Sequence, residues 1–142
     1  MILSSVTESS ASIEIRLASL DDLKALLVLE NKSFTGDRLS RRSFRPAITS
    51  CGSAFFVATR NESELLGYAL LHLRQGTLLA RLYSLAVSSD ARGLGIGKLL
   101  IQACEKKALK KGKMLLRLEV SDVNHTAIAL YQKMGYKEFG HY

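Results

Sequence analysis

The sequence has few residues of the kinds that form disulfide bonds or bind a metal ion. It contains two cysteines, Cys51 and Cys104, among 142 residues, and their spacing matches neither a metal site nor a redox motif. So little cysteine is typical of a reducing compartment and predicts a cytoplasmic protein. The three histidines lack the spacing of metal ligands, so we predict no metal centre. They are His72, His125 and His141.

Long hydrophobic runs and targeting features are also missing. No apolar segment approaches the ~20 residues that a membrane-spanning helix needs, which predicts that no membrane is involved. Residues 1–12 are rich in Ser and Thr and lack the basic start and apolar core of a signal peptide. We expect them to form a flexible N-terminal tail. Residues 13–142 contain no repeat or linker and are expected to form a single domain.

Acidic residues are outnumbered, because 20 Lys and Arg stand against 13 Asp and Glu and give a formal charge of +7. Such an excess suits nucleic acid or a small polyanionic ligand equally well. Aromatic residues are sparse beside the basic ones, which argues against nucleic acid. The basic residues gather in two clusters, which are Arg38, Arg41, Arg42 and Arg45, and Lys106, Lys107, Lys110, Lys111 and Lys113. The second cluster is typical of a solvated helix end.

Hydrophobic periodicity predicts an alternation of strands and helices. We expect strands at 13–17, 54–59, 65–74, 79–87, 114–120 and 136–142, and helices from Ser19, from near Ser40, at 96–111 and at 124–134. Pro46 is expected to kink or end the second helix. The strongly apolar segment 114–120 predicts an interior strand. The order is β-α-α-β-β-β-α-β-α-β, an α/β (α+β) domain with a mixed sheet.

Glycine is concentrated between the strand at 79–87 and the helix after it, in Arg92-Gly93-Leu94-Gly95-Ile96-Gly97-Lys98. A glycine-rich turn that opens a helix leaves main-chain N–H groups free to hold a phosphate. The spacing is not G-x-G-x-x-G, and a P-loop would need another glycine at the position of Arg92 and a hydroxyl after Lys98. Both of those nucleotide-binding classes are excluded. Such turns also occur for tight packing alone.

Arg92, Gly95 and Gly97 fit R-x-x-G-x-G, which resembles the acetyl-coenzyme A loop of the GNAT N-acetyltransferases. The resemblance covers residues 13–142 and implies a GNAT-type, mostly antiparallel central sheet flanked by helices, with the final family strand missing. It implies that the loop holds the coenzyme A pyrophosphate and that the preceding strand end binds the pantetheine arm and thioester. The implied acetyl-CoA-binding residues are Leu85, Ala86, Val87, Arg92, Gly93, Leu94, Gly95, Ile96, Gly97, Lys98 and Asn124.

Four downstream motifs, L-x-L-E-V, S-x-x-N, A-I-A-L-Y and M-G-Y, resemble the bacterial ribosomal-protein-alanine N-acetyltransferase branch. That likeness implies that Glu119 is the general base, directly or through water, and that Tyr131 is the acid for the leaving thiolate. It also implies that Asn124 contacts the pantetheine arm and that the Val87 N–H meets the oxyanion. Taken alone, the residues leave open a charge-paired Glu119, a core-packed Tyr131 and an Asn124 that only caps a helix. We expect Cys104 to be a buried small hydrophobe.

The expected function is therefore acetyl transfer from acetyl-CoA to a primary amine in a ternary complex. The expected acceptor is the N-terminal α-amine of a protein or peptide, and the expected state is a monomer or weak dimer. Two alternatives stay open, a small-molecule amine acetyltransferase and a non-catalytic CoA-binding regulatory module. Three explanations for the missing final strand stay open, which are a truncated chain, a strand supplied by a partner chain and a naturally short variant. Segments 37–44 and 81–87 resemble bacterial proteins that join such a domain to a peptidase-like half, which favours truncation.

Overall fold

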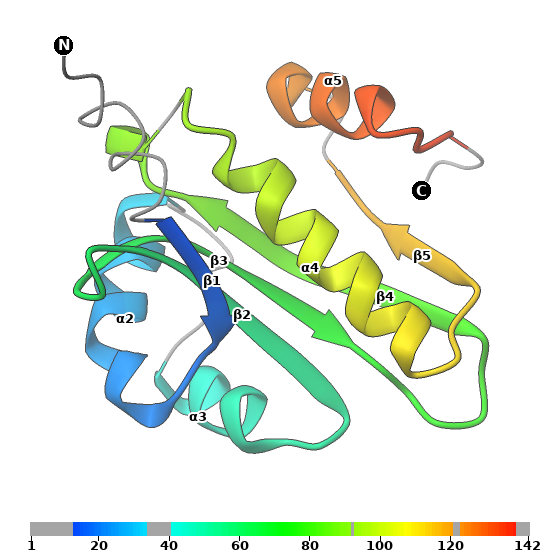
Figure 1. Cartoon of the computed structure of the whole chain (residues 1–142), viewed down its shortest axis with the longest axis horizontal. Coiled ribbons are helices and arrows are strands. Elements are labelled where there is room, and N and C mark those ends of the chain that lie inside the picture. Colours follow the sequence, from blue (N-terminus) through cyan, green and yellow to red (C-terminus); the bar gives the residue numbers. More distant parts are fainter. Residues whose placement is uncertain (1–12, 34–40, 92, 121–122, 139–142) are drawn as a thin grey trace, which may run out of the picture.

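The computed structural model describes residues 13–33, 41–91, 93–120 and 123–138, so the expected tail at 1–12 lies outside the described residues. The elements follow one another in an order close to the predicted one (Figure 1). They are β1 (Ile13–Leu17), η1 (Leu20–Asp22), α2 (Leu23–Ser33), α3 (Arg41–Thr49), β2 (Ser53–Arg60), β3 (Glu64–His72), β4 (Leu79–Val87), η2 (Ser89–Ala91), α4 (Ile96–Lys110), β5 (Leu115–Leu118) and α5 (His125–Lys133).

The strands form one five-stranded sheet in the order β1-β2-β3-β4-β5. All neighbouring pairs are antiparallel except β4 and β5, which run parallel. A parallel pair needs a crossover connection, and α4 supplies it by crossing one face of the sheet (Figure 1). The helices α2 and α3 cover the opposite face. The predicted fold class, a mostly antiparallel sheet flanked by helices, is confirmed.

The alternation of side chains along the strands divides the core into two layers. The layer under α4 contains buried residues of that helix such as Ile96, Leu100 and Cys104, packed on alternate strand positions. The layer under α2 and α3 contains an aromatic cluster whose ring centroids lie 5.3–5.7 Å apart. The cluster consists of Phe44, Phe55 and Tyr68. The prediction that Cys104 is buried is confirmed.

The corner between β1 and α2 is held by Asp22. Its carboxylate accepts hydrogen bonds from both terminal nitrogens of Arg16 at 2.8 Å and from the Ser19 main-chain N–H at 2.7 Å. The Arg16 guanidinium is the main reason that the pKa of Asp22 is lowered. Ser19 and Asp22 thus make a capping box at the start of the first helical segment, as the sequence indicates.

Asp22→Asn should lower the free energy of unfolding by about 1 kcal/mol at pH 7, a modest value because Arg16 is partly exposed. The folded pKa of Asp22 is depressed, so this stabilisation exists above the unfolded pKa of about 4 and is lost as the pH falls below it. Urea unfolding of both proteins between pH 7 and pH 2 measures the effect. A difference that stayed constant down to pH 2 would contradict the assigned role.

Two sequence predictions at element level are wrong, and of the kink or end expected at Pro46 the end is not observed. Segment 114–120 is not an interior strand, because β5 pairs only with β4 among the described residues and Leu115 is 65% exposed. Apolar composition does not distinguish an edge strand from a central one. Pro46 does not end its helix, since α3 continues to Thr49. The described part of the last expected strand, residues 136–138, is not a strand; there the Tyr136 N–H bonds the Tyr131 carbonyl at 2.9 Å.

Candidate active site

The parallel strands β4 and β5 stay paired over only half of β4. Their register joins Leu79 to Leu115 and ends where Leu82 meets Leu118. Beyond this point β5 ends and the chain leaves the sheet toward α5 (Figure 1). Within the described residues, the main chain of 83–87 therefore has no ladder partner on the β5 side. Main-chain N–H and C=O groups of this kind require partners and form a ready edge for an extended ligand.

A β-bulge marks the place where the two strands part. On the β3 side, Leu70 pairs with Ser84 and Leu71 with Leu82, which leaves Tyr83 as the additional residue of β4. A bulge bends the strand and increases its local twist, and bulges are common next to functional sites. The predicted thioester-binding residues Leu85, Ala86 and Val87 follow this bulge. They lie on the unpaired half of the strand.

The glycine loop delivers the N-terminus of α4 to the same end of the sheet. Gly93 and Gly95 have φ values of 84° and 72°, which favour glycine because residues that carry a Cβ atom rarely adopt them. Gly95 is the N-cap of α4 and supplies no side-chain cap, and the first helical hydrogen bond is donated by the Leu99 N–H. The N–H groups of Ile96, Gly97 and Lys98 are thus left for a ligand at the positive end of the helix. Arg92 lies outside the described residues.

Gly97 has a packing role that the motif did not indicate. A Cβ atom at this position would lie 3.1 Å from Leu130 Cδ2 and 3.9 Å from Val87 Cγ2. The absence of a side chain therefore lets α4, α5 and β4 approach one another. Ile96 is a core residue whose side chain is buried, so only its main chain can serve a ligand. Close packing, one of the two functions open to a glycine loop, is therefore observed at Gly97.

Tyr131 combines a buried ring with an available hydroxyl. The residue is 8% exposed, and its ring meets that of Tyr136 edge-on at 6.0 Å. The hydroxyl has no hydrogen bond within the described residues, where Thr59 Oγ1 is the one buried polar side-chain atom lacking a partner. The Tyr131 hydroxyl oxygen therefore reaches solvent. Burial raises the pKa of Tyr131, so the phenol keeps its proton at neutral pH and can donate it.

Asn124 is the N-cap of α5, which was the alternative to a cofactor contact that the sequence left open. Its side-chain oxygen accepts a hydrogen bond from the Ala127 N–H at 3.2 Å. The cap uses the oxygen and leaves the amide NH₂ as a donor. The two roles suggested for Asn124, capping the helix and contacting the cofactor, are therefore compatible.

Glu119 follows β5 directly and lies at the level of the β4 bulge, because Leu118 before it pairs with Leu82. One oxygen of its carboxylate lies 3.1 Å from Arg81 and 3.3 Å from Arg117, and its side chain is 37% exposed. The charge-paired alternative is thus observed. The same position places a solvated carboxylate where β4 and β5 separate, so pairing and a role in proton transfer are compatible.

A buried hydrogen-bond chain near β4 was missed by the sequence analysis. The Tyr68 hydroxyl lies 2.5 Å from Glu30 Oε1 and 2.8 Å from Ser84 Oγ. Glu30 is 1% exposed and Tyr68 is fully buried. The one available signal was a glutamate four residues after Leu26 on the apolar side of a helix. Tyr68, which bonds Glu30, and Ser84, which bonds Tyr68, follow 38 and 54 positions after Glu30 and could not be identified from the sequence.

A hollow of about 320 Å³ opens beside Ser84, on the α3 side of the sheet. It includes Tyr83 and Leu70, the neighbours of Ser84 along the strand and across it. The rings of His72 and Tyr83 stack at 4.7 Å on its wall. Burial, and to a smaller degree Arg81, lower the pKa of His72, which leaves its ring neutral at pH 7. The full lining is Pro46, Ala47, Ser50, Ser53, Leu70, His72 and Tyr83.

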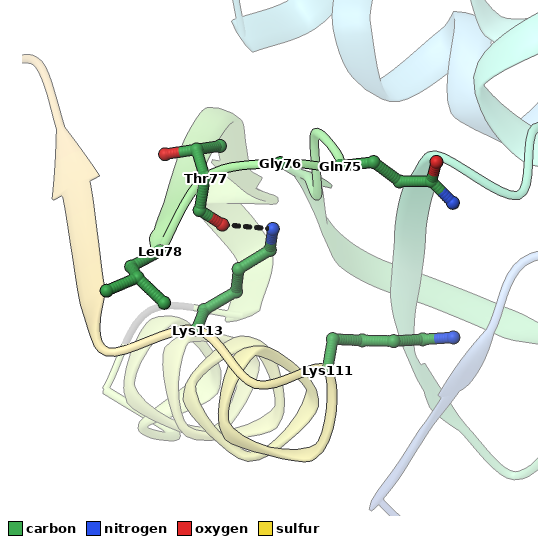
Figure 2. A pocket seen from close by; sticks show the side chains of 6 residues that line it. All are labelled: Gln75, Gly76, Thr77, Leu78, Lys111 and Lys113. Atoms are coloured by element: carbon green, nitrogen blue, oxygen red, sulfur yellow. Dashed lines mark hydrogen bonds between the residues drawn. The ribbon is translucent and has the colours of Figure 1, made fainter.

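A larger hollow of about 560 Å³ lies at the opposite end of β4 and is separate from these groups. Figure 2 shows Lys113 reaching across it toward the turn between β3 and β4. The Lys113 ammonium donates to the main-chain oxygens of Arg74 and Thr77 at 2.5 and 2.6 Å. Lys113 is 7% exposed and joins this turn to the loop after α4. The hollow therefore reflects a structural tie between two turns.

Among the described residues, no three His, Cys, Asp or Glu side chains lie together as a metal ion would require. None of the helices in that part of the chain is long and apolar enough to cross a membrane.

A sequence profile of the Acetyltransferase (GNAT) family matches residues 21–136. The chain is similar to mycothiol acetyltransferase of Paenarthrobacter aurescens (strain TC1), with 38% identity over 86 residues that cover 58% of this chain and 27% of that protein. It is also similar to N-acetyltransferase 8B of Homo sapiens, with 31% identity over 96 residues that cover 66% of this chain and 42% of that protein. The chain spans less than half the length of either relative.

Solved structures share the fold. The ribosomal-protein-S18-alanine N-acetyltransferase from Escherichia coli aligns with a TM-score of 0.79 and 26% identity, over 90% of this chain and 79% of that one. AAC(6')-Iy, in complex with the bisubstrate analogue CoA-S-monomethyl-acetylneamine, aligns with a TM-score of 0.80 and 18% identity, over 92% of this chain and 94% of that one.

The chain belongs to the acetyltransferase (GNAT) family, in which acetyl-CoA is the acetyl donor.

Proposed function

We propose that this domain transfers the acetyl group of acetyl-CoA to a primary amine in a ternary complex. The observation that carries the proposal is the unpaired half of β4, residues 83–87, beside the glycine-capped N-terminus of α4. An extended, amide-containing arm can bond the strand edge while a pyrophosphate meets the helix N-terminus. One ligand with both parts is coenzyme A.

In this proposal different groups of the protein bind the pyrophosphate, the pantetheine arm and the thioester of acetyl-CoA. Main-chain N–H groups of residues 93–98 hold the pyrophosphate, with Arg92 adding charge. The main chain of residues 85–87 and the Asn124 amide bind the pantetheine arm. The Val87 N–H stabilises the oxyanion that forms when the amine attacks the thioester, because a fixed donor at the developing charge lowers the barrier.

Proton transfer is assigned to Glu119 and Tyr131. An alkylammonium loses two protons before it becomes an amide, and the leaving thiolate gains one. Glu119 accepts a proton directly or through water, for which its exposure to solvent provides a route. Tyr131 gives its proton to the thiolate. A covalent route through Cys104 is disfavoured, because burial raises the pKa of that thiol to about 12.

The preferred acceptor is the N-terminal α-amine of a protein or peptide. The motifs around Glu119 and Tyr131 support it, together with the similarity to the Escherichia coli ribosomal-protein-S18-alanine N-acetyltransferase. A small-molecule amine is the second candidate, because a relative is named mycothiol acetyltransferase. The hollow beside Ser84 is open and carries neutral rings and hydroxyls, so it can receive the group next to the amine in either case.

The test follows thiol release from acetyl-CoA with three sets of acceptors. They are peptides with a free N-terminus, the same peptides with the N-terminus formylated, and small amines. Release with the free peptides that is lost on formylation supports the α-amine, whereas release with small amines alone supports the second candidate. Calorimetry measures coenzyme A binding in parallel. Binding without release for any acceptor would favour the regulatory module and contradict the proposal.

A further inference from the structure

Three side chains from separate elements form a buried chain of hydrogen bonds that ends at the candidate site. Glu30 comes from α2, Tyr68 from β3 and Ser84 from β4. The Tyr68 hydroxyl lies between the other two, 2.5 Å from the Glu30 carboxylate and 2.8 Å from the Ser84 hydroxyl. Glu30 is 1% exposed and Tyr68 is fully buried, so the inner part of the chain is shielded from solvent.

The chain has a definite direction of hydrogen bonding. Tyr68 has a single hydroxyl hydrogen and donates it to Glu30, so toward Ser84 it must accept. Ser84 therefore donates to Tyr68, and its lone pairs are free to accept a hydrogen from elsewhere. Burial raises the pKa of Tyr68 far above its usual range, so its hydroxyl remains neutral. Moving every proton one step toward Glu30 gives a second arrangement in which each atom is again bonded.

The outer end of the chain lies beside the hollow to which the proposed function assigns the group next to the acceptor amine. Ser84 is only half-buried, whereas Tyr68 behind it is fully buried. It sits between the Tyr83 bulge and Leu85, on the half of β4 that β5 leaves unpaired. Two of its neighbours, Tyr83 and Leu70, belong to the wall of the 320 Å³ hollow.

We propose that Ser84, Tyr68 and Glu30 form a proton relay that takes up one of the two protons lost by the acceptor nitrogen, an inference that rests on the proposed acetyl transfer. As the C–N bond forms, the nitrogen gives a proton to Ser84 Oγ. Ser84 passes its own proton to Tyr68 Oη, and Tyr68 passes its proton to Glu30. Ser84 and Tyr68 end neutral, and Glu30 ends as a carboxylic acid. The other nitrogen proton goes to Glu119, and the sulfur receives its proton from Tyr131.

The relay provides an acceptor for the second proton that leaves the nitrogen. Two protons leave the nitrogen, yet the exposed carboxylate of Glu119 is already shared with Arg81 and Arg117. A second acceptor in the buried layer removes the need for Glu119 to serve twice.

The decisive variant is Glu30→Gln. Glutamine keeps the shape and still accepts the Tyr68 hydrogen bond, but it cannot take up a proton. We expect kcat to fall about 100-fold with the KM for acetyl-CoA within about twofold. Ser84→Ala, which removes only the outer hydroxyl, should lower kcat to a similar extent and provides a second test if Glu30→Gln folds poorly. Thermal melting of each variant reports whether the fold is intact.

Tyr136→Phe is the matched control, because the Tyr136 hydroxyl also donates to a glutamate, Glu105 on α4, at 2.8 Å, and neither residue belongs to the relay. It should keep more than half of the wild-type kcat. Folded Glu30→Gln and Ser84→Ala variants with wild-type kcat would overturn the relay and leave the proposed function intact. A wild-type protein that transfers acetyl to no amine would overturn the function, and the relay with it.

Discussion

Tyr131→Phe should lower kcat for acetyl transfer about 100-fold while acetyl-CoA affinity changes less than about twofold. The phenylalanine ring retains the buried packing and the edge-on contact with Tyr136, so the fold is preserved. The hydroxyl has no hydrogen bond within the described residues, so its removal breaks no protein contact there. Steady-state thiol release and calorimetry on the same preparation separate the two quantities.

The structure separates the packing role of the Tyr131 ring from any role of its hydroxyl. A tyrosine that only packs in the core would lose little when its solvent-reaching hydroxyl is removed. Wild-type turnover in Tyr131→Phe would therefore identify Tyr131 as a packing residue and would contradict its role as the acid. Glu119→Gln compared with Arg81→Met separates the base from the ion pair, because both variants remove the charge pair between Arg81 and Glu119 and only the first removes the carboxylate. We expect a loss of about 100-fold in kcat for Glu119→Gln alone.

Gly67→Ala should destabilise the protein by about 2–3 kcal/mol and disturb the acetyl-CoA site at the same time. A Cβ atom at Gly67 would lie 2.7 Å from the Ala86 main-chain oxygen and 3.3 Å from side-chain atoms of Ile96 and Leu100. The first contact is with backbone, which cannot rotate away. Relief requires β4 to move at Ala86, on the half strand where we place the thioester. Denaturant unfolding and coenzyme A titration measure the two effects.

Gly52→Ala provides the control for a glycine replacement outside the site. The nearest atom to its added Cβ is Ser50 Oγ at 3.6 Å, an ordinary contact distance. Its unfolding free energy should remain within about 0.5 kcal/mol of the wild type. If Gly67→Ala were equally harmless, the close approach of β3 to β4 would not be important for the position of Ala86.

Local patterns predicted the parts of the fold that local geometry determines. An apolar run after a turn located β4 at residues 79–87 without error, and helical spacing located α4 to within one residue. The same patterns could not decide how an apolar segment pairs, because β5 and an interior strand have the same composition. They also left open whether Pro46 kinks or ends its helix, and α3 continues to Thr49 because its packing on β2 sustains it beyond the proline.

The sequence by itself determined the glycine loop and the family resemblance, because positive φ values and free helix N–H groups follow from a few consecutive residues. Only the tertiary structure decided which groups lie around the loop. The packing of whole elements separates β4 from β5 after Leu82 and places Gly97 against Leu130. It also joins Glu30 to Tyr68 and Ser84, which are distant in the chain and meet because α2 packs on the sheet. Such contacts depend on how whole elements pack, and no short segment of the chain contains that information.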